Sequence, residues 1–358
     1  MRYTLYNTDR KVLAFDFKDM YLEVLDDEFL PYALRGRICT SSCDTKADIK
    51  KTLHDIDAVK DFLSNRVLSF RRSNAKAILN AAHFSQKIST NNRAKIALSC
   101  MSLSMTDNFW TKPDDTSDLK FADINLRKNK LSDASYSIAI LGKPVLATRD
   151  ELRSDVMGQG MYPKFWKNVD DTVEIWKTDK TNTFVNTNAE LQVSELLDTC
   201  DIPHVRYRRE VRDGRVFAVS KCFVDDEMSF VTASDVAMSL ISNDLLDFDA
   251  TGFANMCVTD YVFANTDRHS DNWGFLVNNA TNRITKMAPL FDHNQALVAD
   301  YFGTDIRDLI YEPTGKTYAE TLSEYAGVAT LELDKDMLPK KCKERYLVYL
   351  NAKRCFQK

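Results

Sequence analysis

Asn265-Thr-Asp-Arg-His-Ser-Asp-Asn272, followed further along by Pro289-Leu-Phe-Asp292, is the stretch of this sequence that decides the fold. Between the two segments, residues 274–277 and 284–290 are short apolar runs, which predict two strands. The residues that separate the runs, 278–283, are rich in turn formers. The sequence therefore predicts a hairpin that folds this region back on itself.

The predicted hairpin brings three polar side chains to one end. Asn272 precedes the first strand and Asp292 follows the second, so we expect the two to share one divalent cation, with Asp267 one loop upstream. Transfer of a phosphoryl group from ATP requires such parts: oxygen ligands for Mg²⁺ and a separate carboxylate near the acceptor hydroxyl. An ordinary polar hairpin is the alternative, because Asp and Asn are common in surface turns.

Composition sets the broad class of the protein. The chain has 358 residues, enough for two domains or one two-lobed enzyme, and its net charge of −4 with 28% charged residues is typical of a globular protein. We expect no direct contact with nucleic acid. No apolar run is long enough to span a membrane and the first residues alternate like a strand, which predicts a cytoplasmic protein without membrane contact; secretion or transfer into a host cell is left open.

Cysteine and histidine spacing argues against zinc. The eight cysteines form no C-x-x-C pair, and the five histidines do not complete a zinc-ligand pattern with them. We expect reduced thiols. His269 is interpreted as a hydrogen-bonding strut of the loop that contains it.

The first part of the chain predicts a small sheet covered by helices. Residues 3–6 and 11–17 are interpreted as a hairpin and residues 21–25 as a further strand. Residues 57–105 show helical periodicity that predicts three helices. Residues 111–118 predict a polar loop, and residues 136–141 a strand.

Two glycines, Gly158 and Gly160, precede a predicted pair of strands. Glycines at such a place allow backbone amides to approach phosphate oxygens. A plain turn is the alternative interpretation.

Lys177 and a helix after it suggest a charged pair. The run 173–177 alternates like a strand and projects Lys177 to one face, and residues 188–198 have helical periodicity. Either Glu190 or Glu195 of that helix is placed to face Lys177. The alternative is a surface lysine on an exposed strand.

After a second hairpin with a turn at Asp213-Gly214, the pattern changes from strands to helices near residue 223. The arginines of the hairpin are interpreted mostly as a solvated face. Helices are predicted at residues 233–245, 252–264, 318–325 and 340–353.

These elements predict an α+β, two-lobed protein-kinase-like fold with a mixed sheet lobe before a mainly helical lobe. We place an N-terminal α+β subdomain at 1–135, the N-lobe with phosphate loop, lysine strand and helix at 136–223, and the helical C-lobe with catalytic and metal loops at 224–358. The candidate site residues follow each other in the order that such a fold requires: Gly158 and Gly160, Lys177, Glu190, Asp267, Asn272 and Asp292.

The segments 265–276 and 288–292 resemble the N-x-D-x-H-x-x-N and P-x-Y-D signatures of the HipA-like serine/threonine kinases, which include the shorter CtkA-like bacterial proteins. The resemblance covers roughly residues 141–292, with a further echo at Asn108-Phe-Trp-Thr-Lys112. It departs from the family in its glycine loop and at Phe291, where tyrosine is common.

The resemblance implies roles for individual residues. Asp267 would accept or orient the proton of a Ser or Thr hydroxyl, and Asn272 and Asp292 would coordinate Mg²⁺. The residues implied in binding ATP are Gly158 and Gly160 at the phosphates, Lys177 with its partner Glu190, and Lys221 to Phe223 at the adenine. Some relatives phosphorylate themselves in the phosphate loop, and Ser154 is the nearby candidate.

Three hypotheses follow. The leading one is an ATP- and Mg²⁺-dependent serine/threonine protein kinase that acts on a protein substrate. The second is a nucleotide-binding pseudokinase or regulator with an antitoxin-like protein partner, as in a toxin–antitoxin pair. The third is a lipid kinase, because the Asp-Arg-His-x-x-Asn string also resembles phosphoinositide kinases; the absence of a basic membrane face favours a protein substrate.

Overall fold

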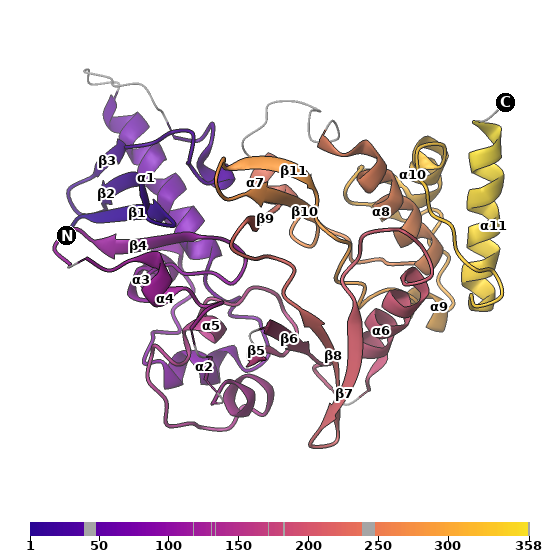
Figure 1. Cartoon of the computed structure of the whole chain (residues 1–358), viewed down its shortest axis with the longest axis horizontal. Helices are drawn as coiled ribbons and strands as arrows, with labels where there is room; N and C mark the ends of the chain where they lie inside the picture. The colour runs from indigo at the N-terminus through magenta and orange to yellow at the C-terminus, as the bar shows by residue number, and fades with distance from the viewer. Residues whose placement is uncertain are drawn as a thin grey trace.

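The structure is a computed structural model of the chain. It describes residues 1–38, 48–116, 118–129, 131–132, 134–170, 172–181, 183–237 and 248–356. Sheets and helices are mixed along the chain, and Figure 1 shows the N-terminal sheet and the C-terminal helices at opposite ends of the molecule.

The first sheet is four-stranded and antiparallel, with the order β3-β2-β1-β4. Its strands are β1 (Tyr3–Asn7), β2 (Arg10–Asp16), β3 (Tyr21–Val24) and β4 (Phe109–Pro113). The predicted hairpin and third strand are confirmed. The loop expected from residue 111 onward is wrong at its start, because Phe109, Trp110 and Thr111 are buried and pair with β1.

Helices complete this N-terminal unit. They are the 3₁₀ turn η1 (Tyr32–Leu34), α1 (Asp48–Asn65), α2 (Ala75–Ala81), α3 (Thr90–Ser99) and the one-turn α4 (Phe121–Ile124). The three helices expected within 57–105 are confirmed. Apolar residues of α1, such as Val59 and Leu63, join Leu13 and Phe15 of β2 in one core, so burial of the helix face holds α1 on the sheet.

The second sheet has the order β5-β6-β8-β7. Its strands are β5 (Lys164–Val169), β6 (Thr172–Lys177), β7 (Tyr207–Arg212) and β8 (Arg215–Lys221), and α6 (Val185–Leu197) packs on β7 and β8. The glycine loop lies between the short helix α5 (Arg153–Val156) and β5. All four predicted strands are confirmed.

The strand predicted at 136–141 is wrong. Tyr136–Ile140 form the wound segment η2, a short π-helix. Three consecutive residues, Ile138, Ala139 and Ile140, are buried, whereas a strand would turn alternate side chains to opposite faces. The side chain of Asn74 donates to the carbonyls of Ala139 and Ile140, which satisfies the end of the segment.

The third sheet has the order β11-β10-β9 and contains the predicted hairpin. Its strands are β9 (Met228–Thr232), β10 (Gly274–Asn278) and β11 (Arg283–Met287). The hairpin is confirmed. The expected change from strands to helices near residue 223 is wrong, because one more strand, β9, follows before the helices begin. A Cβ on Gly274 would lie 2.1 Å from the carbonyl oxygen of Val231, so only glycine fits at this position of the β9–β10 pair.

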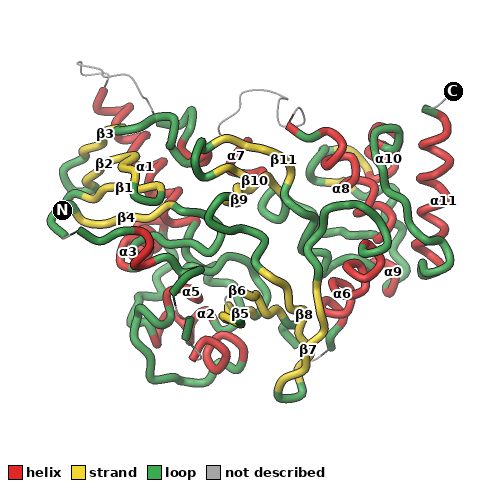
Figure 2. The backbone as a smooth tube through the Cα atoms, in the orientation of Figure 1, coloured by secondary structure: helices red, strands yellow, loops and turns green. Residues whose placement is uncertain are grey.

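Helices dominate the C-terminal part (Figure 2). They are α7 (Ala233–Ala237), α8 (Ala250–Phe263), α9 (Val298–Tyr301), α10 (Tyr318–Tyr325) and α11 (Lys340–Cys355), with the two-stranded β12 (Ile310–Tyr311) and β13 (Lys316–Thr317). The predicted helices at 252–264, 318–325 and 340–353 are confirmed. The helix predicted at 233–245 begins as α7, and its residues 238–245 lie outside the described residues.

The helix α8 is the centre of the second core. Residues 253–263 are all buried, so α8 is enclosed on every side, and it contacts β11, α10 and α11. In the described ranges no helix combines the length and the apolar character needed to span a membrane.

Candidate active site

The loop 265–272 leaves the C-terminus of α8 through Ala264, whose φ of 50° turns the chain. The side chain of Asn272 closes this loop: its Nδ2 donates to the carbonyl of Asp267 (2.6 Å), and its Oδ1 accepts from the amide of His269 (2.9 Å). Asn272 is buried, while Asp267 is exposed. The ring of His269 accepts a hydrogen bond from the amide of Asp271, so it acts within the loop, as the expected strut.

Lys177 joins the second sheet to the end of the hairpin. Its Nζ donates to Oε1 of Glu190 (3.0 Å), to Oδ1 of Asp292 (3.2 Å) and to the hydroxyl of Tyr207 (3.3 Å). The structure places Glu190 of α6, which is 2% exposed, against Lys177; Glu195 of the same helix is exposed. The three residues expected to act together at this point are therefore adjacent.

The charges of Lys177, Asp292 and Glu190 shift one another's pKa values. Burial opposes the charged amine of Lys177, but Asp292 and Glu190 outweigh burial and raise its pKa well above the usual value. Burial also opposes the charge on Asp292, yet the cations Lys177 and Lys164 lower its pKa. Burial raises the pKa of Glu190, and Lys177 offsets part of that shift. The cluster thus holds an ionised carboxylate, Asp292, beside a lysine that stays charged.

The backbone around Asp292 is held in an unusual conformation. The φ of Asp292 is 61°, in the left-handed region that non-glycine residues adopt rarely. Asn294 donates from Nδ2 to Oδ1 of Asp292 (3.0 Å), and its own Oδ1 is buried without a hydrogen-bond partner among the described residues. Strain and an unmet acceptor at one place are typical of a ligand site.

The glycine loop is tied down by Arg72, which is 4% exposed. Its guanidinium donates to the carbonyls of Asp155 (3.3 Å), Gly158 (3.2 Å) and Lys164 (2.5 Å). Gly160 has a φ of 91°, and a Cβ there would lie 2.4 Å from Nζ of Lys164. Glycine is favoured here by the positive φ, which L side chains rarely adopt, and the lysine amine lies directly over it.

Sequence reasoning assigned no role to Lys164, although it lies close to the glycine loop. It is the partner of Lys177 across the β5–β6 pair, so both side chains lie on the same face of the sheet. Burial, together with the nearby charges of Arg72 and Lys177, lowers the pKa of the Lys164 amine to about 7. A lysine directly opposite Lys177 in the strand pair was the signal that could have found it.

Tyr162 is a second residue that sequence reasoning missed. Its hydroxyl accepts a hydrogen bond from Nε2 of Gln295 (2.5 Å), which joins the glycine loop to the segment after Asp292. Burial, together with the charges of Asp267, Asp179 and Asp292, raises the pKa of Tyr162 to about 12. Asp267 and Asp292 are also close enough for Asp292 to raise the pKa of Asp267, after the larger effect of burial.

The segment that follows β8 contacts the end of the hairpin through aromatic rings. Phe223 lies 5.6 Å from Phe291 and 5.5 Å from Phe230 between ring centroids. Lys221, by contrast, is exposed at the end of β8. The structure therefore brings Phe223, but not the side chain of Lys221, to the candidate site. Ser154 is 2% exposed within α5, so its hydroxyl is covered in this conformation.

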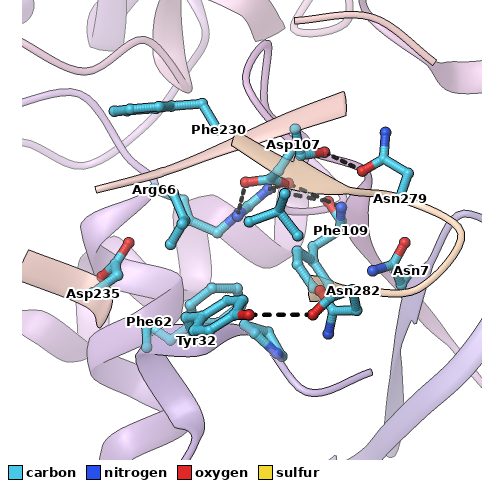
Figure 3. Close-up of a pocket in the computed structure, with 15 residues that line it drawn as sticks. Asn7, Tyr32, Phe62, Arg66, Asp107, Phe109, Phe230, Asp235, Asn279 and Asn282 are labelled. Carbon is cyan, nitrogen blue, oxygen red and sulfur yellow. Dashed lines mark hydrogen bonds and ion pairs between the residues drawn. The ribbon is translucent and has the colours of Figure 1, made fainter. Parts of the chain in front are cut away.

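A separate small cavity lies between the first and third sheets (Figure 3). Its volume is about 50 Å³, and its walls include the ion pair of Arg66 with Asp107 (2.8 Å) and the hydrogen bond from Tyr32 to Asn282 (3.3 Å). None of the candidate catalytic residues lines it. With room for only one or two water molecules, it is a joint between two units rather than a nucleotide site.

Comparison with known proteins gives the fold. No protein-family model and no curated protein matches the sequence. Among solved structures, HipA of Shewanella oneidensis, determined as a toxin–antitoxin complex with HipB and operator DNA, is similar over 99% of this chain and 90% of its own, with a TM-score of 0.55 at 12% identity. The proinflammatory kinase CtkA of Helicobacter pylori is matched over 54% of this chain and 90% of its own, with a TM-score of 0.38 at 14% identity. The chain has a HipA-like fold, as the resemblance in sequence implies.

Proposed function

We propose that the protein is a phosphotransferase that uses ATP and Mg²⁺ to phosphorylate Ser or Thr hydroxyls of a protein substrate. The observation that carries the proposal is the contact of Lys177 with both Glu190 and Asp292, because a kinase site requires a lysine for the phosphates beside an acid for the metal. On this proposal residues 136–223 form the N-lobe and 224–358 the C-lobe of a two-lobed kinase, and 1–135 form a further subdomain.

Asn272 and Asp292 would hold Mg²⁺. Their oxygens suit a hard cation, and the unmet Oδ1 of Asn294 beside Asp292 supports a ligand at this place. The Oδ1 of Asn272 accepts one hydrogen bond and retains a second lone pair. Bound Mg²⁺ would supply positive charge to the phosphate oxygens. Because Lys177 now contacts Asp292, it also keeps that carboxylate ionised and ready for the metal.

Two lysines and a glycine loop would bind the phosphates. Lys177 is the expected contact, and we add Lys164, which lies on the same face of the β5–β6 pair and over Gly160. The backbone amides near Gly158 and Gly160 would complete the anion site. The adenine would lie beside Phe223, against the backbone of residues 221–223.

Asp267 would receive the proton of the acceptor hydroxyl. It is exposed, so an incoming side chain can reach it, and its raised pKa makes the carboxylate a better base than an ordinary aspartate. The amide of Asn272 fixes the backbone of Asp267 through the 2.6 Å hydrogen bond. One side chain therefore links the base to the metal site.

The HipA structure favours a second proposal on partners. That protein was determined with HipB and operator DNA, so an antitoxin-like protein that binds this chain is proposed as well. The expectation that the chain makes no contact with nucleic acid gains no support from this fold and stays a prediction. Co-purification with the products of neighbouring reading frames, followed by a DNA shift assay of the complex, tests both.

The kinase proposal is tested by acid-to-amide substitutions. Labelled ATP is incubated with a protein acceptor, in parallel with mixed phosphoinositides, for the unaltered protein, Asp267→Asn and Asp292→Asn. We expect transfer to protein, a loss of at least about 100-fold in each variant, and retained Mg²⁺-dependent nucleotide binding in Asp267→Asn only. Asp271→Asn is the matched control, because Asp271 is exposed in the same loop.

Three results would argue for other functions. Undiminished autophosphorylation in both variants would contradict the assigned roles. Tight ATP binding by the unaltered protein without γ-phosphate transfer would support a nucleotide-binding regulator. Labelling of lipid but not of protein would identify a lipid kinase.

A further inference from the structure

Arg268, the residue after the proposed base, is fully enclosed. Its side chain and that of Asp260 in α8 are both 0% exposed. The guanidinium binds the carboxylate through two parallel hydrogen bonds, from Nε to Oδ2 (2.8 Å) and from Nη2 to Oδ1 (2.9 Å). This geometry fixes the plane of the guanidinium, because a fork-to-fork pair has one favourable orientation.

The remaining nitrogen of Arg268 bridges the two ends of the β10–β11 hairpin. Nη1 donates to the carbonyl oxygen of Asn272 (2.8 Å) and to the carbonyl oxygen of Phe291 (2.8 Å). These two oxygens therefore lie within two hydrogen-bond lengths of each other. Asn272 is one proposed metal ligand, and Phe291 directly precedes the other, Asp292.

Asp260 is itself held rigidly. It accepts hydrogen bonds from Nδ2 of Asn265 (2.8 Å) and from the hydroxyl of Tyr311 (2.7 Å) in addition to those from Arg268. Burial would raise the pKa of Asp260, but Arg268 outweighs burial and lowers it. The pair is thus a charged anchor within the core: α8 supplies Asp260, and the further partners come from the catalytic loop (Asn265) and β12 (Tyr311).

We propose that Arg268 is a positioning residue that sets the separation of the two metal ligands, Asn272 and Asp292. The inference rests on the proposed function, since it assigns a role toward Mg²⁺. Mg²⁺ demands near-ideal octahedral geometry, whereas Ca²⁺ accepts variable distances and angles. A loss of the Nη1 bridge should therefore weaken Mg²⁺ more than Ca²⁺, and this difference separates positioning from a general role in stability.

Arg268→Lys is the test variant. Lysine retains the positive charge opposite Asp260, but its single ammonium cannot hold the carboxylate and both carbonyls in one plane. Tyr311→Phe is the matched control, because it removes one buried hydrogen bond from the same carboxylate and leaves the Nη1 bridge in place. Thermal unfolding of each variant establishes that it is folded.

The experiment measures the affinity of a non-hydrolysable ATP analogue by calorimetry without metal, with Mg²⁺ and with Ca²⁺. We expect Arg268→Lys to reduce the gain in affinity from Mg²⁺ by about 10-fold or more, with a smaller loss for Ca²⁺ and little change without metal. Tyr311→Phe should match the unaltered protein. Should Arg268→Lys not fold, Asp260→Asn loosens the same guanidinium and is expected to shift the Mg²⁺ gain in the same direction.

Two outcomes would overturn the inference, and they differ in meaning. If the unaltered protein gains affinity from Mg²⁺ and the variant retains that gain, or loses it equally for Ca²⁺, Arg268 does not set the ligand separation although the proposed function stands. If the unaltered protein binds the analogue equally with and without Mg²⁺, the proposed metal site itself is wrong.

Discussion

The Nζ of Lys177 lies 3.2 Å from Oδ1 of Asp292, although the two residues are 115 positions apart in the chain. This contact joins β6 of the second sheet to the end of the β10–β11 hairpin, and Glu190 of α6 completes it at 3.0 Å. Three elements therefore meet at one largely buried ionic cluster.

Lys177→Met should remove activity and also destabilise the fold. Without the lysine, the buried carboxylate of Glu190 and the half-buried one of Asp292 remain without their cation, which costs about 3 kcal/mol in the free energy of unfolding. Urea unfolding measures the loss. Lys286→Met, at an exposed lysine of β11, is the control and should change little. Equal stability of both variants would show that the cluster is not ionised as described.

Lys164 should make nucleotide binding depend on pH. Its pKa is lowered to about 7, and phosphate favours the protonated amine, so affinity for an ATP analogue should fall as the pH rises from 6 to 8. In Lys164→Met the affinity should be lower and nearly independent of pH over this range. A variant that retains the full pH dependence would place the titrating group elsewhere.

The same lysine also has an effect on stability, with a defined sign. Between pH 7 and its unfolded pKa of 10.5, the unfolded chain binds one more proton at this residue than the folded chain. The free energy of unfolding of the unaltered protein, relative to that of Lys164→Met, should therefore rise as the pH increases through this window. Unfolding curves of both proteins at pH 7 and pH 9.5 measure the difference.

His293 should make the fold sensitive to mild acid. Burial and the charge of Arg268 together lower its pKa to about 3, so the folded protein holds this ring neutral. Below pH 6.5 the unfolded chain takes up a proton that the folded chain does not, and stability is lost as the pH falls. At pH 5 the contribution is about 2 kcal/mol. Unfolding of His293→Gln at pH 7 and pH 5 should show a smaller loss than that of the unaltered protein.

Gly274→Ala should separate β10 from β9. The new Cβ would meet the backbone oxygen of Val231 at 2.1 Å, and neither strand can move without disturbing the loop that carries Asn272. We expect a loss of at least about 2 kcal/mol. Gly214→Ala is the comparison: its Cβ would meet no atom within 4 Å, and its φ of 71° alone should cost about 1 kcal/mol.

Local patterns predicted most of the elements. Turn residues and alternation identify the hairpins of the second and third sheets, and the spacing of Asp267, Asn272 and Asp292 identifies the loops of the candidate site. The pairing of Lys177 with a glutamate of the next helix is also visible, since both positions follow from periodicity. The choice of Glu190 over Glu195 depends on which helix face α6 turns inward, and packing against β7 and β8 decides that.

What the sequence did not reveal depends on contacts between distant segments. Strand β9 is short and lies beside β10 only because the chain returns 42 residues later, from Thr232 to its partner Gly274. Lys164 gains its role from the register of β5 with β6, and Arg268 from carbonyl oxygens at both ends of a hairpin. Hydrogen bonds to backbone oxygens leave no trace in residue identities, so such contacts are visible only in three dimensions.

Arg72 belongs to the N-terminal unit, yet its guanidinium holds the carbonyls of Gly158 and Lys164. A shortened chain that starts at the proposed lobe boundary, residue 136, would thus lose the hydrogen bonds from Arg72 that hold the glycine loop. The N-terminal unit therefore supports the glycine loop directly. A molecule that binds this unit and displaces Arg72 would also disturb the place where phosphate is expected to bind.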